Sequence, residues 1–238
     1  MTRHSPFPPE PVRVPVMRHR WATISFLHWP YPAAEIQRRL PAGLEVEPWD
    51  GQAWVGLVPF EMTVRPPVGP GAARFPETNV RTYVVGPDGR PGVYFFSLDA
   101  ASASAVTTAR ATWRLPYFLA RMAVERTGGA VRYRSERRRP GPAGAGHDVT
   151  VLPGQPIAHP DEFTHYLTAR FTLWNTVAGA VMRTQADHPP WELQRAEVRG
   201  LREDLLAAAG LPAPVGDPRV HFSAGVDVRI GAPRRVSR

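Results

Sequence analysis

Residues 75–84, FPETNVRTYV, place a polar side chain at every second position. In a β-strand successive side chains point to opposite faces, so Glu77, Asn79 and Arg81 would lie together on one face. Burying such a row without partners would cost several kcal/mol. The row must therefore face a polar pocket or belong to an internally paired structural network, and both interpretations are open.

The segments around this row predict a meander of antiparallel strands. Strands are expected at 20–30, 93–100 and 221–230, and a hairpin at 44–64 with its turn at Asp50-Gly51. Residues 131–138 and 148–152 should form a second hairpin. Helices are expected after Pro32 as far as Pro41, and at 101–113, 117–129, 160–171 (N-capped by Asp161) and 201–210. This order of elements predicts one α+β domain dominated by antiparallel strands.

The ends of the chain differ in composition from its middle. Residues 1–16 are proline-rich and are expected to form a flexible arm, residues 17–232 the domain, and residues 233–238 a basic tail. No apolar run approaches the roughly 20 residues that span a bilayer, and the first residues lack the apolar core of a secretory signal. A cytoplasmic location is therefore the default expectation.

The basic residues are unusual in kind. All 29 residues counted as lysine or arginine are arginine, and the net charge is +8. Without lysine, no side chain of the protein can form an imine with a carbonyl substrate. The densest basic stretch, residues 132–146, lacks the interleaved aromatics of a single-strand binder, so a solvated surface is favoured over a nucleic-acid partner.

Motifs that would indicate a metal or a cofactor are absent from the sequence. There is no cysteine, and the eight histidines form neither HExxH nor another tight metal-binding spacing. No GxGxxG, P-loop or GxSxG motif occurs, which argues against a nucleotide cofactor and against a serine nucleophile on an elbow. The sequence therefore predicts neither a metal nor a cofactor.

Six stretches carry a family resemblance: FLHWP (26–30), DGQAWVGLVPFEM (50–62), FPETNVRTYV (75–84), GVYFFSLDA (92–100), LPYF (115–118) and HPPWEL (188–193). Together they resemble the YqjF-like bacterial proteins of the acetoacetate decarboxylase-like superfamily, over about residues 17–230. The resemblance implies a strongly curved antiparallel sheet or barrel, flanked by short helices, with a polar pocket inside. It implies no activity, because that family is itself a domain of unknown function.

A comparison with acetoacetate decarboxylase itself indicates which positions would face the pocket. An arginine ahead of its first strand is similar to Arg20, and two of its acids are similar to Glu61 and Glu77. Its helical arginine is similar to Arg110. Its Schiff-base lysine falls on Tyr117, and the lysine beside that one is also replaced. The resemblance therefore carries over the arginines and the glutamates, but not the imine chemistry.

The row and the resemblance together give a candidate site. An arginine would bind a carboxylate through charge-assisted hydrogen bonds. A glutamate and a tyrosine would serve as general base and general acid. The candidates are Glu77 and Tyr117 for catalysis, and Arg20, Glu61, Asn79, Arg81 and Arg110 for ligand binding.

Several of these residues also have a structural interpretation. Glu61 would otherwise form an ion pair with one of the candidate arginines, and Arg110 would pair with Asp99 or Glu77. Tyr117, expected in the first turn of a helix, would otherwise be an ordinary core tyrosine.

Three functions are compatible with these observations. The first is a pocket that binds a small carboxylate or carbonyl compound without Schiff-base chemistry. The second is a lysine-independent lyase, hydratase or isomerase that uses Glu77 and Tyr117 as acid and base. The third is a non-catalytic scaffold or partner-binding protein. A homo-oligomer is compatible with all three.

Overall fold

The computed structural model of the chain describes residues 4–66, 71–138 and 141–236. The strands of this part are β1 Met17–Pro32, β2 Glu45–Val46, β3 Gln52–Arg65, β4 Ala73–Val85, β5 Pro91–Ala100, β6 Tyr117–Thr127, β7 Ala130–Arg137, β8 Gly146–Pro156, β9 Thr172–Val177, β10 Ala180–Asp187, β11 Leu193–Glu203, β12 Arg219–Ile230 and β13 Arg234–Arg235. The helices are α1 Ala33–Gln37, α2 Ala103–Thr108, a π-helical turn η1 Ala109–Trp113, α3 Glu162–Thr168 and α4 Leu205–Ala208.

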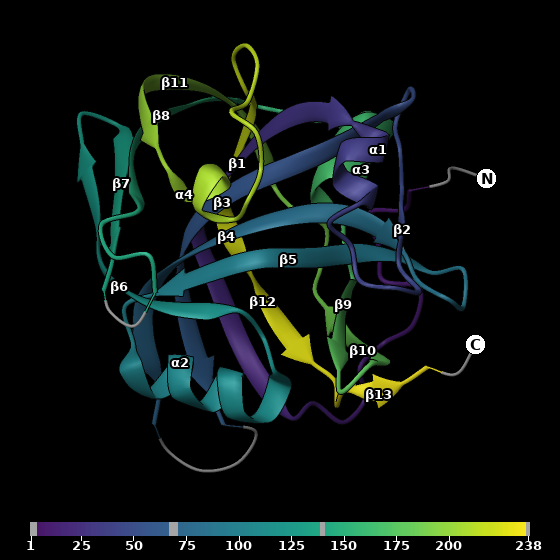
Figure 1. The fold of residues 1–238 in the computed structure, drawn as a ribbon. Coiled ribbons are helices and arrows are strands. Elements are labelled where there is room, and N and C mark those ends of the chain that lie inside the picture. Colours follow the sequence, from purple (N-terminus) through teal and green to yellow (C-terminus); the bar gives the residue numbers. More distant parts are fainter. Residues whose placement is uncertain (1–3, 67–70, 139–140, 237–238) are drawn as a thin grey trace.

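All of these strands belong to one sheet, in the order β13-β10-β9-β5-β6-β7-β8-β11-β12-β1-β3-β4-β2. Further pairings join β4 to β5 and β10 to β12, which lie far apart in that order, so the sheet curves strongly back on itself (Figure 1). Neighbouring strands are antiparallel except beside β5, which is parallel to β6 and β9. The predicted curved, mainly antiparallel sheet with short helices is confirmed.

Strand β4 holds the polar row and lies between β3 and β5. Glu77 faces Phe60 of β3, and Asn79 faces both Val58 of β3 and Leu98 of β5. With a paired strand on each side, the backbone groups of β4 are satisfied within the sheet. Its side chains are therefore held at fixed positions on the two faces.

The turn of the predicted hairpin at 44–64 is correct, but the two strands on either side of the turn do not pair with each other along their length. Trp49 pairs with Gln52 across Asp50 and Gly51, whose φ values of 47° and 76° suit a tight two-residue turn. The strand before the turn, however, is only the short β2, and it pairs with β4 at Val84 and Val85 rather than with β3.

The helix predicted at 117–129 is wrong, because these residues form β6. The glycine pair that suggested a helix end is instead a hairpin turn, with φ of 58° at Gly128 and 82° at Gly129, between β6 and β7. Two residues with positive φ fit the right-handed twist of an antiparallel pair, and glycine adopts them without strain. Tyr117 therefore begins a strand rather than a helix.

The other predicted helices are present in shortened form. Ser102 caps α2 by accepting a hydrogen bond from the backbone N–H of Ala105. Asp161 caps α3 in the same way through Thr164, as expected. In the region 201–210 only residues 205–208 are helical, because β11 continues to Glu203. None of the helices in the described ranges is long and apolar enough to cross a membrane.

The N-terminal segment, expected to be an unpacked arm, contacts the body of the protein in its described part. Val12 is buried and donates its backbone N–H to Asp187 at 2.8 Å. His4 is also buried and packs against the rings of Trp49 and Tyr166. At the other end, β13 pairs with β10, so residues 234–235 of the basic tail are part of the sheet.

Candidate ligand-binding site

A cavity of about 350 Å³ lies between the inner face of the sheet and the helical segment formed by α2 and η1. It is lined by side chains from β1, β3, β4, β5, β6, β9, β10 and β12, by the end of α3, and by residues that follow α3 and β10. Its lining is mostly apolar, with a few polar and charged groups. Its volume and lining are in the range of pockets that bind small molecules.

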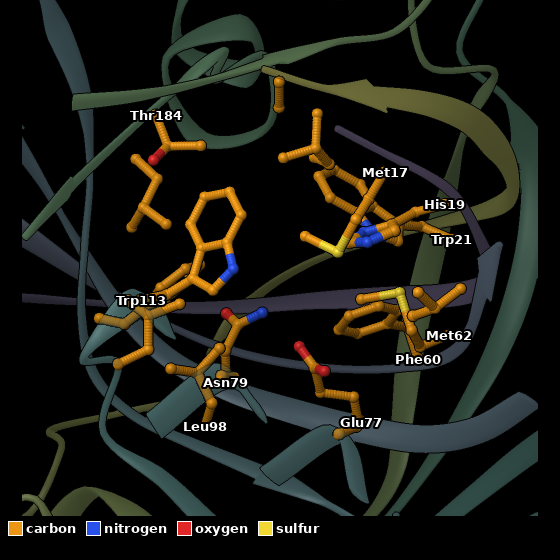
Figure 2. Close-up of a pocket in the computed structure, with 18 of the residues that line it drawn as sticks. Met17, His19, Trp21, Phe60, Met62, Glu77, Asn79, Leu98, Trp113 and Thr184 are labelled. Atoms are coloured by element: carbon orange, nitrogen blue, oxygen red, sulfur yellow. The ribbon is translucent and has the colours of Figure 1, made fainter. Parts of the chain in front are cut away.

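Alternate residues of β4 line this cavity: Ala73, Phe75, Glu77, Asn79 and Arg81. The last three are at most 9% exposed. The shared face predicted from the alternation is therefore observed. Figure 2 shows the carboxyl group of Glu77 and the amide of Asn79 pointing into the same space, across from Met17 and His19.

The carboxyl oxygen Oε2 of Glu77 accepts a hydrogen bond from the hydroxyl of Tyr117 at 3.0 Å. Burial raises the pKa of Glu77 to about 8; the Tyr117 hydrogen bond opposes this shift and the charge of Asp99 adds to it. Burial and the adjacent carboxyl also raise the pKa of Tyr117 well above its ordinary value. At neutral pH the pair is therefore mainly uncharged, with a carboxyl proton available to the cavity.

Arg81 lies farther along the same strand face and forms no ion pair with any described carboxylate. Its Nη2 donates to the carbonyl of Leu167 at 3.0 Å, and its guanidinium lies 5.5 Å from the ring centroid of Phe26. Its Nε is buried without a hydrogen-bond partner. The positive charge of Arg81 is therefore not balanced by a neighbouring acid.

Arg170 also lines the cavity, and the sequence analysis did not select it as a site residue. Its Nη1 donates to Glu47 at 2.6 Å, while its Nη2 has no partner. The guanidinium groups of Arg170 and Arg81 lie 4.8 and 5.7 Å from the ring centroid of Tyr83, which places the two cations on one aromatic side chain. The sequence signal for Arg170 is its helical spacing from the buried Leu167.

Other polar groups of the lining also lack partners. Figure 2 shows two of the residues concerned, His19 and Thr184, in the wall of the cavity. Buried side-chain nitrogen or oxygen atoms without a hydrogen bond occur in His19, Trp21, Asn79, Arg81, Arg170, Thr184 and His188, all of which line the cavity. Buried polar atoms in proteins are normally satisfied, so this concentration indicates a space filled by water or by a ligand.

The two histidines of the lining are neutral at physiological pH. Burial lowers the pKa of His19 to about 4, and it does the same for His188, whose Nδ1 lies 2.7 Å from the carbonyl of Pro189. The motif HPPW does not by itself predict that His188 faces a cavity. No group of histidine or acidic side chains in the described ranges is arranged to hold a metal ion.

Arg20 and Glu61 do not line the cavity, because each alternates with residues that do. His19 and Trp21 flank Arg20 and point inward, while Arg20 lies 3.6 Å from Asp227 on the outside. Phe60 and Met62 likewise flank Glu61.

The structural interpretation of Glu61 holds, with partners other than the candidate arginines. Glu61 pairs with Arg74 at 2.8 Å and with Arg126.

Arg110 also lies outside the lining, and it donates to the backbone carbonyl of Tyr117 at 2.8 Å rather than to an acid. Asp99, expected as a partner of Arg110, forms a fully buried ion pair with Arg137 at 2.8 Å.

Comparison with solved structures identifies the fold. The enduracididine biosynthesis enzyme MppR complexed with pyruvate superposes with a TM-score of 0.68, at 14% identity over 94% of this chain and 91% of that one. Acetoacetate decarboxylase from Legionella pneumophila gives a TM-score of 0.62 at 15% identity, over 97% and 92% of the two chains. An acetoacetate decarboxylase-like enzyme from Sphingomonas wittichii RW1 gives 0.62 at 14% identity, over 93% of each chain. The protein has the acetoacetate decarboxylase-like fold.

Sequence comparison identifies the family. Residues 18–227 match the family model DUF2071, described as an uncharacterized conserved protein. The uncharacterized protein YqjF of Bacillus subtilis (strain 168) is 37% identical over 217 residues, which cover 90% of this chain and 89% of that protein. The chain belongs to this YqjF-like DUF2071 family, as its motifs implied.

Proposed function

We propose that this protein binds a small carboxylate or carbonyl compound in the cavity beside β4. The observation that carries the proposal is Arg81, a buried guanidinium whose charge no described carboxylate balances. A guanidinium stays charged in proteins, and leaving such a charge buried and unpaired is costly. An anion that enters the cavity would remove this cost and gain charge-assisted hydrogen bonds.

The charges of the other lining groups support an anionic ligand. Glu77 is mainly protonated at neutral pH, because burial raises its pKa to about 8. Arg170 is paired with Glu47, and the lining histidines are neutral. The cavity therefore carries one uncompensated positive charge, which favours a monoanion over a neutral or cationic ligand.

A carbonyl group would be held by hydrogen bonds rather than by a covalent bond. The chain has no lysine, so no side chain can form an imine, and a tyrosine stands where the resemblance placed the reactive lysine. The protonated carboxyl of Glu77 is a donor suited to a carbonyl oxygen.

A second function rests on the pairing of Glu77 with Tyr117. An acid of pKa about 8 inside a cavity can gain and lose a proton near neutral pH, and Tyr117 lies 3.0 Å away to share it. This geometry favours proton-transfer chemistry on a bound oxo acid, as in a lyase, hydratase or isomerase. Proton exchange or turnover of oxo acids by the wild type, lost in Glu77→Gln, would establish this activity.

Thermal unfolding with a panel of small carboxylates tests the binding proposal. A ligand at a hundred times its dissociation constant adds about 2.7 kcal/mol to stability, which raises the melting temperature by several degrees. We expect a shift for the wild type and for Arg138→Gln, an exposed arginine outside the cavity, but none for Arg81→Gln. If no carboxylate or carbonyl compound shifts the wild type, the proposal fails and a scaffold or partner-binding role is favoured.

A further inference from the structure

The polarity of the cavity lining changes along β4. From Ala73 to Arg81 the lining residues of this strand change from apolar side chains to a carboxyl, an amide and a guanidinium. At roughly 3.3 Å per residue, this row extends over about 26 Å of strand. A two- or three-carbon acid at Arg81 would leave most of the row without contact.

The end of the cavity away from Arg81 opens to solvent and is mainly apolar. Ala73, Ser104 and Thr108 line the cavity and are exposed, which marks this end as the mouth. Just inside it, two cross-strand pairs of β3 and β4 present apolar side chains on the lining face. They are Val64 opposite Ala73 and Met62 opposite Phe75.

We infer that the ligand is an elongated aliphatic monocarboxylate, with its carboxylate at Arg81 and its apolar chain extending toward the mouth. This inference rests on the proposed function and names the class of compound that the cavity accepts. An amphipathic ligand of this kind matches both ends of the cavity. Between the two ends its chain would pass Asn79 and the uncharged carboxyl of Glu77, opposite which stand the apolar side chains of Leu98 and Phe60.

The inner end has the donors that a carboxylate needs. Arg81 Nε and Arg170 Nη2 are buried and unpartnered, and both guanidinium groups lie over the ring of Tyr83. Two guanidinium donors on one carboxylate give strong, directional hydrogen bonds.

On the sheet wall of the outer end, the polar side chain of His19 faces Val64 across the β1–β3 pairing. Both of its ring nitrogens are buried without partners. Because this ring is neutral, its presence near the mouth does not add a second charge that would compete for the carboxylate.

Isothermal titration calorimetry with straight-chain acids from acetate to decanoate tests the inference. Burying a methylene group is worth about 0.8 kcal/mol, or about fourfold in affinity, and ordering of the chain lowers this to about two- to fourfold. Octanoate should therefore bind about 16- to 250-fold more tightly than butanoate. Octanol, which lacks the carboxylate, should bind more weakly than octanoate.

A pair of variants on α2 provides the control. Ala105 lines the cavity, so Ala105→Trp should block its outer part and remove the gain with chain length while butanoate still binds. Ala103 is exposed on the same helix and does not line the cavity, so Ala103→Trp should keep the gain. Retained butanoate binding shows that Ala105→Trp is folded.

Two outcomes would overturn this inference, and they differ in what they say about the proposed function. If carboxylates bind with an affinity that does not depend on chain length, the elongated ligand is wrong while the carboxylate site stands. If no acid of any length binds, the proposed function fails as well. Equal binding of octanol and octanoate would exclude Arg81 as the carboxylate partner.

Discussion

Replacing Glu77 with glutamine should make the protein markedly less sensitive to alkaline pH. The carboxyl has a pKa of about 8 in the folded protein, against 4.5 as its ordinary value, because it is buried. In Glu77→Gln the amide keeps an acceptor for the Tyr117 hydroxyl and resembles the protonated acid in shape and charge. The variant therefore removes the titration without removing the contact.

The direction and size of the effect follow from proton linkage. Below pH 4.5 Glu77 is protonated in both the folded and the unfolded protein, and its contribution to stability is fully present. Between pH 4.5 and 8 the unfolded chain releases the proton while the folded protein retains it, so stability falls as pH rises. The pKa difference corresponds to a loss of up to about 5 kcal/mol by pH 8 and above.

Urea unfolding of the wild type and Glu77→Gln from pH 5 to pH 9 measures this loss. The free energies of unfolding should be similar near pH 5 and should diverge with rising pH, with the variant more stable at pH 8. Glu192→Gln, at an exposed position, is the matched control and should follow the wild type. Parallel curves for the wild type and Glu77→Gln would refute the argument, because they would mean that Glu77 titrates alike in both states.

Three further predictions concern other groups. Arg137→Ala should lower the free energy of unfolding by about 3–5 kcal/mol in urea, because it strands the buried Asp99, whereas the neighbouring exposed Arg138→Ala should not; equal losses would contradict this. Acidification from pH 6.5 toward pH 4 should destabilise Glu77→Gln, in which the opposing titration of Glu77 is removed, because burial lowers the pKa of His147 and His188 to about 4 and each contributes up to about 3 kcal/mol of loss; a free energy of unfolding of this variant that rises from pH 6.5 to pH 4 would be inconsistent with that. Incubation with acetoacetate and borohydride should leave no covalent adduct on any internal residue by mass spectrometry, and such an adduct would show that imine chemistry does not need the missing lysine.

The strand alternation predicted correctly which side chains of β4 share a face. Glu77, Asn79 and Arg81 share a face because β4 is a regular strand with partners on both sides. The same rule would also have excluded Arg20 and Glu61. Each of these two alternates with aromatic or apolar neighbours that line the cavity, whereas the resemblance implies that both face the pocket.

The remaining differences come from contacts that local sequence does not specify. The stretch that follows Pro116 has side chains compatible with a helix. Its pairing with β5 at Tyr117 and with β7 farther along makes it a strand that presents Tyr117 to Glu77. Arg170 and His188 follow α3 and β10, and they reach the cavity because the sheet curves back on itself. Such long-range geometry is set by the whole fold, which a reading of neighbouring residues does not provide.

A crystal structure of the wild type with the carboxylate that gives the largest melting shift tests the central claim most directly. The account predicts density for the ligand inside the cavity, with a carboxylate oxygen about 2.7–3.2 Å from a guanidinium nitrogen of Arg81. Its chain should extend along β4 toward Ala73 and α2. Density for the ligand only outside the cavity, or a carboxylate directed away from Arg81, would contradict the account.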